Sequence, residues 1–174
     1  MISIVVVCDE NYGIGYENKL LCHLPGDLKN FKSLTKEGVV VMGRKTWESI
    51  GSNPLPNRYN KVVSSKPVNH SEMMKGDCMW CNNIEASLDP VCFDSGVGYF
   101  RYRDIFIIGG GSIYKQSINF CNKIYLSRIK NRFENVDTYF PNLHNLQGWV
   151  KESDKDMTTD LDSFKWSLET WVKL

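Results

Sequence analysis

Three near-continuous apolar runs, rich in β-branched residues, constrain the fold of this chain more than any other feature. They occupy residues 2–8, 38–43 and 105–108. A strand that is apolar at nearly every position is covered on both faces, which is typical of the middle of an α/β sheet. Glycines follow the second and third runs, and residues suited to a helix come next. This order predicts parallel strands joined through helices.

Shorter segments predict further strands, at residues 61–67, 78–81, 123–129, 149–153 and 164–172. The last alternates with a period of two, which indicates one covered face and an antiparallel pair at the edge of a mixed sheet. Short helices are expected after Gly43, from Ile84 and after Gly111, and a loop is expected at residues 94–98. Because no linker or repeat is present, residues 1–174 are expected to form a single domain.

The charge balance gives no support to a nucleic-acid-binding protein. Lys and Arg number 21 against 20 Asp and Glu, so the formal net charge is +1 and no overall field attracts a polyanion. The first apolar run is too short to span a bilayer and has no basic region before it, so a cytoplasmic location and reduced cysteines are expected. Cys78 and Cys81 form a lone C-x-x-C pair, for which a structural role is favoured over redox chemistry or half of a metal site. No metal is expected.

An acidic residue on the apolar side of a predicted helix is the first candidate functional residue. Apolar residues at intervals of three and four form one stripe that should face a core or a pocket. These residues are Leu24, Leu28, Phe31 and Leu34. Asp27 lies four residues before Phe31, so its carboxylate should lie beside the aromatic ring. Alternatively, Asp27 follows Pro25 only to complement the helix dipole. This segment alone leaves both interpretations open.

Two corners between a strand and a helix are candidate phosphate sites. At the first, Gly43 ends a strand, and Arg44 and Lys45 bring positive charge to the backbone amides that follow. Its spacing is near that of a P-loop, but Arg44 intervenes before the lysine and the preceding residues form a strand, which excludes an NTPase. At the second, the glycines of residues 109–111 let bare amides approach a pyrophosphate. The loop at residues 9–15 also contains two glycines, which suit either a plain turn or the close approach of a ligand.

Taken in order, the motifs of the chain resemble those of the dihydrofolate reductase family. The matching segments are Ile14-Gly15, Leu24-Pro25-x-Asp27-Leu28 with Phe31-Lys32, Met42-Gly43-Arg44-Lys45-Thr46-Trp47-Glu48-Ser49-Ile50-Gly51, Leu55-Pro56-x-Arg58, Ser64-Ser65, Ile108-Gly109-Gly110-Gly111-x-x-Tyr114 and Asp137-Thr138-x-Phe140-Pro141. Each motif alone is a weak pattern, whereas their order and spacing together are specific.

The resemblance implies both a fold and an activity. The fold is a single-domain α/β structure with a mixed, mostly parallel twisted sheet of about eight strands, a C-terminal antiparallel strand pair and about four flanking helices. The activity is NADPH-dependent reduction of 7,8-dihydrofolate to 5,6,7,8-tetrahydrofolate, with hydride transfer to C6 and protonation at N5, in support of one-carbon metabolism and thymidylate synthesis.

The resemblance also implies the substrate site. Asp27 matches the catalytic acid that binds the 2-amino group and N3 of the pterin and favours protonation at N5. Arg58 matches the arginine that binds the α-carboxylate of the glutamate tail, which suits its guanidinium fork. Burial would raise the pKa of Asp27 and the helix N-terminus would lower it, and the sequence leaves the net direction open. The expected substrate-binding residues are Val5, Val6, Asp27, Leu28, Phe31, Lys32, Ile50, Arg58 and Ser127.

An NADPH site follows from the same resemblance. Val7 and Ile14 match positions whose backbone contacts the nicotinamide amide. Arg44, Ser65 and Lys66 match the cluster around the 2′-phosphate, which favours NADPH over NADH. In the family the first peptide bond within the triple-glycine corner is cis. The expected cofactor-binding residues are Val7, Ile14, Gly15, Arg44, Lys45, Thr46, Ser64, Ser65, Lys66, Ile108, Gly109, Gly110, Gly111, Ser112, Ile113 and Tyr114.

Departures from the family pattern keep other functions open. Cys22 stands where the family almost always has tryptophan, so loop order or proton delivery is expected to differ. Val6 and Val7 are bulkier than the alanines often found there. A binding protein that has lost catalysis is therefore an alternative, and a reductase of another pterin or a pyrimidine is a third, which Arg58 argues against. The expected protein is a monomer with a small-molecule substrate and no nucleic-acid or membrane partner.

Overall fold

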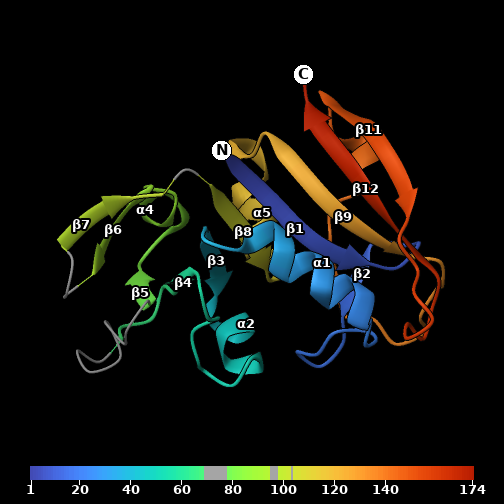
Figure 1. The fold of residues 1–174 in the computed structure, drawn as a ribbon, viewed down its shortest axis with the longest axis horizontal. Helices are drawn as coiled ribbons and strands as arrows, with labels where there is room; N and C mark the ends of the chain where they lie inside the picture. The colour runs from blue at the N-terminus through green and yellow to red at the C-terminus, as the bar shows by residue number, and fades with distance from the viewer. Residues whose placement is uncertain (69–77, 95–97, 103) are drawn as a thin grey trace.

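An eight-stranded sheet forms the centre of the computed structural model (Figure 1), which describes residues 1–68, 78–94, 98–102 and 104–174. The order of the strands in the sheet is β11-β12-β9-β1-β8-β3-β4-β5. Their bounds are β1 (Ile2–Cys8), β3 (Val39–Gly43), β4 (Tyr59–Val63), β5 (Cys78–Cys81), β8 (Ile105–Gly109), β9 (Lys123–Ile129), β11 (Trp149–Asp156) and β12 (Trp166–Lys173).

The sheet is parallel through its centre and antiparallel at one edge. β1 pairs in parallel with β8 and β9, β3 with β4 and β8, and β4 with β5. β12 runs antiparallel to both β9 and β11. The three apolar runs thus become the central strands β1, β8 and β3, where Ile4, Val41 and Ile107 are fully buried. The predicted α/β fold, with its mixed sheet and antiparallel C-terminal pair, is confirmed.

Four α-helices occur in the described part of the chain. They are α1 (Pro25–Thr35), α2 (Arg44–Ser49), α4 (Ile84–Ser87) and α5 (Gly111–Ser117), with 3-10 turns η1 (Ile118–Phe120) and η2 (Leu143–Asn145). In Figure 1, α1 crosses in front of the sheet and α5 lies behind it. Phe31 and Leu34 of α1 pack on a cluster that includes Val40. Ile113 of α5 packs instead on the large cluster that contains Ile4. Both faces of the central strands are therefore covered.

Two small sheets complete the fold. β2 (Gly13–Gly15) pairs with β10 (Thr138–Tyr139), and β6 (Val91–Asp94) pairs with β7 (Gly98–Arg101). The second pair was not expected. Asp94 and Gly98, the ends of the predicted loop, are opposite each other in this hairpin, and residues 95–97 lie outside the described residues. Among the described residues β6 and β7 form a sheet of their own, and four residues each are too few to show a periodic pattern in the sequence.

Two further expectations differ in detail. The strand predicted at residues 61–67 is β4, which spans residues 59–63 because its pairing with β3 runs from Tyr59 to Val63. The apolar stripe of α1 is not buried throughout, since Leu24 is 4% exposed but Leu28 is 37% exposed. No helix in the described ranges is long and apolar enough to cross a membrane.

Candidate active site

Asp27 and Ser127 meet between α1 and β9. Pro25 begins α1, where its missing N–H leaves no helical hydrogen bond unmade. Asp27 follows in the first turn, and its Oδ1 accepts a hydrogen bond from Ser127 Oγ at 2.5 Å. Ser127 lies opposite Val7 of β1 and is 2% exposed. The carboxyl group of Asp27 therefore turns toward the sheet, which a role limited to the helix dipole does not explain.

Burial has the largest influence on the ionisation of Asp27. It raises the pKa of the carboxyl group, the hydrogen bond from Ser127 opposes this effect, and the negative charge of Asp162 raises the pKa further. The net direction is upward, which answers the question that the sequence left open. A shielded carboxyl group with a raised pKa is protonated over a wider range of pH than an exposed one, as proton-transfer chemistry requires.

Arg58 and Phe31 form a second group near the end of α1. The Arg58 guanidinium carbon lies 5.7 Å from the centroid of the Phe31 ring. Its Nε donates to Pro56 O at 2.9 Å and its Nη1 donates to Thr35 Oγ1 at 3.1 Å. Nη2 has no hydrogen-bond partner among the described residues. Because Arg58 is only 8% exposed, a carboxylate that reached it would be bound in a weakly solvated place.

The other predicted substrate residues lie at different depths. Val5 and Val6 of β1 are 9% and 3% exposed. Lys32, on α1, is exposed, and Ile50, at the C-terminal end of α2, is 37% exposed. The Val5 side chain lies in the same cluster as Phe31, whereas the Val6 side chain lies in the cluster on the opposite face of the sheet, so Val6 reaches this side only through its backbone.

The triple-glycine corner between β8 and α5 packs directly against the first turn of α2. The Gly109–Gly110 peptide bond is cis, as the resemblance implies. Gly109 has a φ of +127°, which side chains rarely allow, and a Cβ there would lie 3.3 Å from Tyr114 Oη. A Cβ on Gly110 would lie 3.3 Å from Thr46 Oγ1. Two segments that the sequence analysis assigned to one cofactor, more than sixty residues apart in the chain, therefore lie side by side.

Tyr114 links this corner to the strand that faces Ser127. Its Oη donates to Val5 O at 2.9 Å, and its ring packs edge-on against Phe140 with 5.1 Å between centroids. Val5 and Val7 lie on the same strand, and Val7 is opposite Ser127. β1 consequently connects the triple-glycine corner with the Asp27 carboxyl group.

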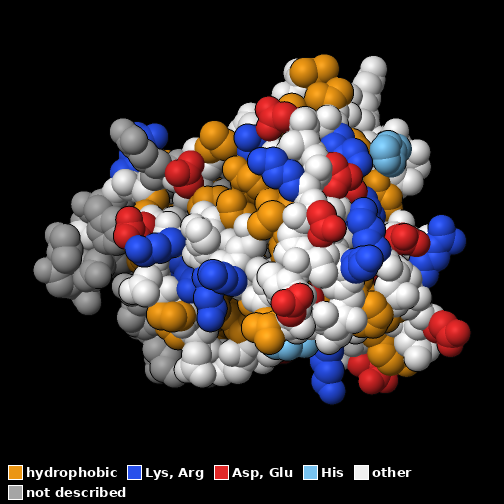
Figure 2. Space-filling view, turned by 45° about the vertical axis from the view of Figure 1, so that its right-hand side comes forward, with side chains coloured by type: hydrophobic (Ala, Val, Ile, Leu, Met, Phe, Trp, Pro, Cys, Tyr) orange, Lys and Arg blue, Asp and Glu red, His pale blue; other side chains and the backbone are white. Residues whose placement is uncertain are grey.

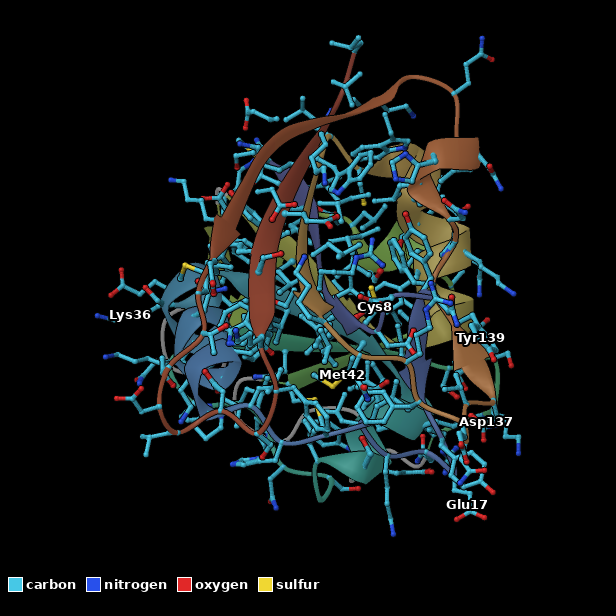
Figure 3. The ribbon with its side chains drawn as sticks, turned by 90° about the vertical axis from the view of Figure 1, so that its right-hand side faces the viewer. Cys8, Glu17, Lys36, Met42, Asp137 and Tyr139 are labelled. Atoms are coloured by element: carbon cyan, nitrogen blue, oxygen red, sulfur yellow. The ribbon has the colours of Figure 1, made fainter. Side chains whose placement is uncertain are left out.

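The loop that follows β2 contacts both Asp137, just before β10, and Lys45 in the first turn of α2. The sequence analysis did not predict these contacts. Asp137 Oδ2 accepts from Glu17 N at 2.8 Å, and Asp137 N donates to Gly15 O at 3.1 Å. Glu17 and Asp137 lie together in Figure 3, far from Lys36 of the turn after α1. Asn18 Nδ2 donates to Lys45 O at 3.1 Å, so the loop reaches the first turn of α2. The Asp137-Thr138 motif was the only sequence signal for this contact.

The predicted 2′-phosphate residues follow two neighbouring parallel strands. Gly43 and Val63 pair at the ends of β3 and β4, which brings residues 44 and 64 to the same edge of the sheet. Arg44 Nε lies 3.0 Å from Glu48 Oε1, and its guanidinium lies 5.9 Å from the Trp80 ring. Trp80 was not predicted. Ser64 Oγ accepts from Lys66 N at 3.1 Å. Ser65, Lys66 and Ser112 are exposed.

Comparisons with known proteins agree with this geometry. A sequence model of the dihydrofolate reductase family matches residues 1–173. The chain belongs to the dihydrofolate reductase family. The dihydrofolate reductase of Buchnera aphidicola subsp. Schizaphis graminum is 38% identical over 149 residues, 85% of this chain and 83% of that protein. That of Bacillus subtilis is 36% identical over 160 residues, 92% of this chain and 86% of that protein.

A solved structure extends the likeness to the whole fold. It is the dihydrofolate reductase from Enterococcus faecalis complexed with NADP(H) and RAB-propyl, with a TM-score of 0.82 and 29% identity over 99% of this chain and 96% of that one. The predicted reaction is therefore confirmed as that of the dihydrofolate reductase family, namely reduction of 7,8-dihydrofolate to tetrahydrofolate with NADPH.

The residues at the triple-glycine corner fit NADPH, the cofactor of the family. Arg44 and Lys45 bring positive charge to the first turn of α2, and the hydroxyl of Thr46 lies beside backbone that carries no side chain. Cations, a hydroxyl and bare amides are the groups that bind phosphate oxygens. The donor set therefore suits a phosphorylated dinucleotide.

The unusual Cys22 adds no charge to the candidate site. The thiol is partly buried, and burial, followed by the charges of Asp27 and Asp162, raises its pKa to about 11. It is therefore neutral near pH 7. The expected change in loop order or proton delivery at this position stays a prediction.

Proposed function

We propose that Asp27 is the catalytic residue that binds the pterin edge and favours protonation at N5. The observation that carries this assignment is the position of its carboxyl group, which turns from the first turn of α1 toward β9 and meets Ser127. Shielding from water raises its pKa and strengthens its interaction with a positively charged or amide-like ring edge.

Both oxygens of Asp27 can accept further hydrogen bonds. Ser127 occupies one lone pair of Oδ1, which leaves the other lone pair of Oδ1 and those of Oδ2 for the 2-amino group and N3 of the pterin. The productive complex carries one proton shared by this carboxyl group and the pterin, so kcat/KM should fall above the pKa of Asp27; once the proton is at N5, the ionised carboxylate beside the ring stabilises it. NADPH, when bound, supplies the hydride that goes to C6. Burial of β1 and β9 around Ser127 keeps bulk water away from this edge.

The remaining substrate contacts follow from position. The side chain of Val5, which lies in the cluster on the α1 face, and the backbone of Val6, whose side chain lies in the opposite cluster, would form the floor under the pterin. Phe31 would line the pterin and benzoyl groups. Arg58 would bind the α-carboxylate of the glutamate tail, for which Nη2 is available. The full proposed set is Val5, Val6, Asp27, Leu28, Phe31, Lys32, Ile50, Arg58 and Ser127.

The proposed cofactor contacts surround the triple-glycine corner and the first turn of α2. Val7, Ile14 and Gly15 would meet the nicotinamide end. Arg44, Ser65 and Lys66 would bind the 2′-phosphate and so favour NADPH over NADH. The rest of the set is Lys45, Thr46, Ser64, Ile108, Gly109, Gly110, Gly111, Ser112, Ile113 and Tyr114.

We also propose that residues 1–174 act as one domain, as a monomer and in the cytoplasm. One sheet that contains strands from residue 2 to residue 173 supports a single domain. Six free thiols suit a reducing compartment. Positive and negative side chains are interspersed over the face in Figure 2, which does not favour a polyanionic partner. Light scattering of the purified protein tests the monomer.

A turnover assay tests the assigned roles. NADPH should be oxidised only when dihydrofolate is present, and NADH should be a much poorer donor. Asp27→Asn should lower kcat/KM by about 100-fold or more, as for loss of a catalytic acid, and leave NADPH affinity within about twofold. Asp160→Asn, on an exposed loop, removes the same charge and should retain activity. Loss of NADPH binding in Asp27→Asn would refute the role given to this residue.

A further inference from the structure

The loop between β11 and β12 is attached to the start of α1 by one carboxylate. Asp162 Oδ1 accepts a hydrogen bond from Gly26 N at 2.8 Å, across 136 residues of sequence. Its Oδ2 accepts from Thr159 N and Thr159 Oγ1, both at 2.8 Å, and from Trp166 Nε1 at 3.0 Å. Trp166 is 1% exposed, so a buried indole anchors the carboxylate. In Figure 1 this loop runs beside the end of α1 that begins the helix.

Asp162 supplies a cap that α1 does not make itself. Leu24 precedes the helix and has no side-chain capping hydrogen bond, and Pro25 has no N–H. The Gly26 amide is therefore an early unpaired donor of the helix, and Asp162 satisfies it. Asp162 takes the place of the missing N-cap side chain, so the start of α1 is fixed to the β11–β12 loop one residue before Asp27, whose own carboxyl group faces Ser127.

The absence of a side chain at residue 26 makes this contact possible. A Cβ on Gly26 would lie 2.6 Å from Asp162 Oδ2 and 3.1 Å from Thr159 Cγ2. Real Cβ atoms do not approach so closely, so any larger residue would displace the loop. Gly26 and Asp162 therefore act as a pair.

We propose that Asp162 is a positioning residue of the active site: by capping α1 from the β11–β12 loop, it holds the Asp27 carboxyl group toward the pocket and places a second negative charge beside it. This inference rests on the proposed role of Asp27. Asp162 bonds to Gly26, Thr159 and Trp166 and is proposed to contact neither the pterin ring nor the cofactor, so it acts only through Asp27.

The charges around Asp27 decide in which direction Asp162 shifts the pKa of the Asp27 carboxyl group. Asp162 from the β11–β12 loop, Cys22 from the segment before α1 and Tyr114 from α5 are the titratable groups coupled to it. Cys22 and Tyr114 are neutral near pH 7 because burial raises the pKa of each. Although partial burial raises the pKa of Asp162, the hydrogen bonds from Gly26, Trp166 and Thr159 prevail and bring it to about 2. Asp162 is therefore ionised near neutral pH, and its negative charge favours the protonated form of Asp27.

Two variants disturb the contact in different ways. Asp162→Asn removes the charge and replaces one acceptor oxygen with an amide donor, so part of the hydrogen bonding is lost with it, whereas Gly26→Ala keeps the charge and displaces the loop. Asp160→Asn is the control, because this exposed neighbour carries the same charge in the same loop. The measurements are the pH profile of kcat/KM for dihydrofolate and the ¹³C titration of the Asp27 carboxyl carbon by NMR.

The expected result is a lower pKa of Asp27 in both variants and an unchanged profile in the control. On the alkaline limb, kcat/KM of each variant should fall about threefold relative to its own low-pH plateau, the effect of one nearby screened charge. NADPH affinity should not change. An unshifted Asp27 titration in Asp162→Asn or, if that variant does not fold, in Gly26→Ala would overturn the proposal. If instead Asp27→Asn kept full activity, the proposed function itself would fail, while the ¹³C titration would still report on Asp162.

Discussion

Asp27 and Ser127 approach each other from α1 and β9 across 100 residues of sequence, and their hydrogen bond opposes the effect of burial. The hydroxyl can stabilise the ionised carboxylate because it donates to Oδ1, whereas burial stabilises the protonated form. The pKa of Asp27 therefore depends on two opposing effects: the hydrogen bond from Ser127 lowers it, and burial against the sheet raises it.

Removing this hydroxyl should move the balance toward the protonated form. In Ser127→Ala the pKa of Asp27 should rise, so the alkaline limb of the kcat/KM profile should move to higher pH. At a fixed alkaline pH, the ratio of kcat/KM to its low-pH plateau should rise about threefold, as for loss of one hydrogen bond to a charged group. Ser127→Thr keeps the hydroxyl and should retain the original profile. A limb that moved to lower pH in Ser127→Ala would show that the hydroxyl does not stabilise the carboxylate.

Two glycines with positive φ allow backbone strain to be separated from site geometry. Gly109 has a φ of +127° and its missing Cβ would meet Tyr114 and Thr46, whereas Gly148 has a φ of +84° and nothing within 4 Å of its missing Cβ. Alanine at either position should cost about 1 to 3 kcal/mol of unfolding free energy through strain, measured by urea denaturation. Only Gly109→Ala should also raise the Kd for NADPH, by about tenfold or more, since one displaced phosphate contact costs at least that much. Equal affinities in the two variants would remove this corner from the cofactor site.

At the scale of elements, the site depends on short pieces held together by their ends. β2 is paired with β10, and the loop after it reaches α2 through Asn18. Asp137 is exposed, and its pKa is lowered chiefly by the hydrogen bond from the Glu17 amide. An exposed carboxylate that holds a loop by one such bond makes that loop easy to open.

Loss of the Asp137 carboxylate should open this loop. In Asp137→Ala the Glu17 amide loses its acceptor, so its hydrogen exchange should become much faster, and the rate of hydride transfer should fall about tenfold because the loop covers the site for less time. Asp156→Ala is a matched control, since Asp156 is also an exposed aspartate that accepts a backbone amide, that of Thr158. Unchanged exchange at Glu17 would mean that other contacts hold the loop.

The elements that the sequence predicted well are those whose signal is local. The central strands were readable because burial on both faces requires apolar residues at consecutive positions. The triple-glycine corner was predictable because its motif lies within a few residues. The Asp27 segment alone left two interpretations open, and only the order of the motifs along the whole chain favoured a pocket acid. The contact between Asp162 and Gly26 and that between Asn18 and Lys45 were not predictable, because each joins segments that only the folded chain brings together. β6 and β7 were missed because they form a separate hairpin of two four-residue strands, which are too short to show a periodic pattern.

At the scale of the whole molecule, the fold distributes six free thiols unequally. Five of them are buried, and Cys22 alone is partly exposed. Burial protects a thiol both by blocking access and by raising its pKa, since the thiolate is the reactive form. The native protein should therefore present a single accessible cysteine, Cys22, whose pKa the charge of Asp27 raises.

Alkylation followed by mass spectrometry checks this expectation and connects it with the active site. Native protein should be labelled at Cys22 only, and urea-unfolded protein at all six cysteines. With its pKa raised to about 11, Cys22 should react at pH 8 about 100-fold more slowly than a free thiol of ordinary pKa. Asp27→Asn and Asp162→Asn each remove a negative charge that raises this pKa, so both should speed the reaction, and Asp160→Asn should not. Rapid labelling of Cys8 or Cys121 in the native protein would show that the sheet opens far more readily than its burial implies, whereas equal rates in all three variants would separate Cys22 from the charges around Asp27.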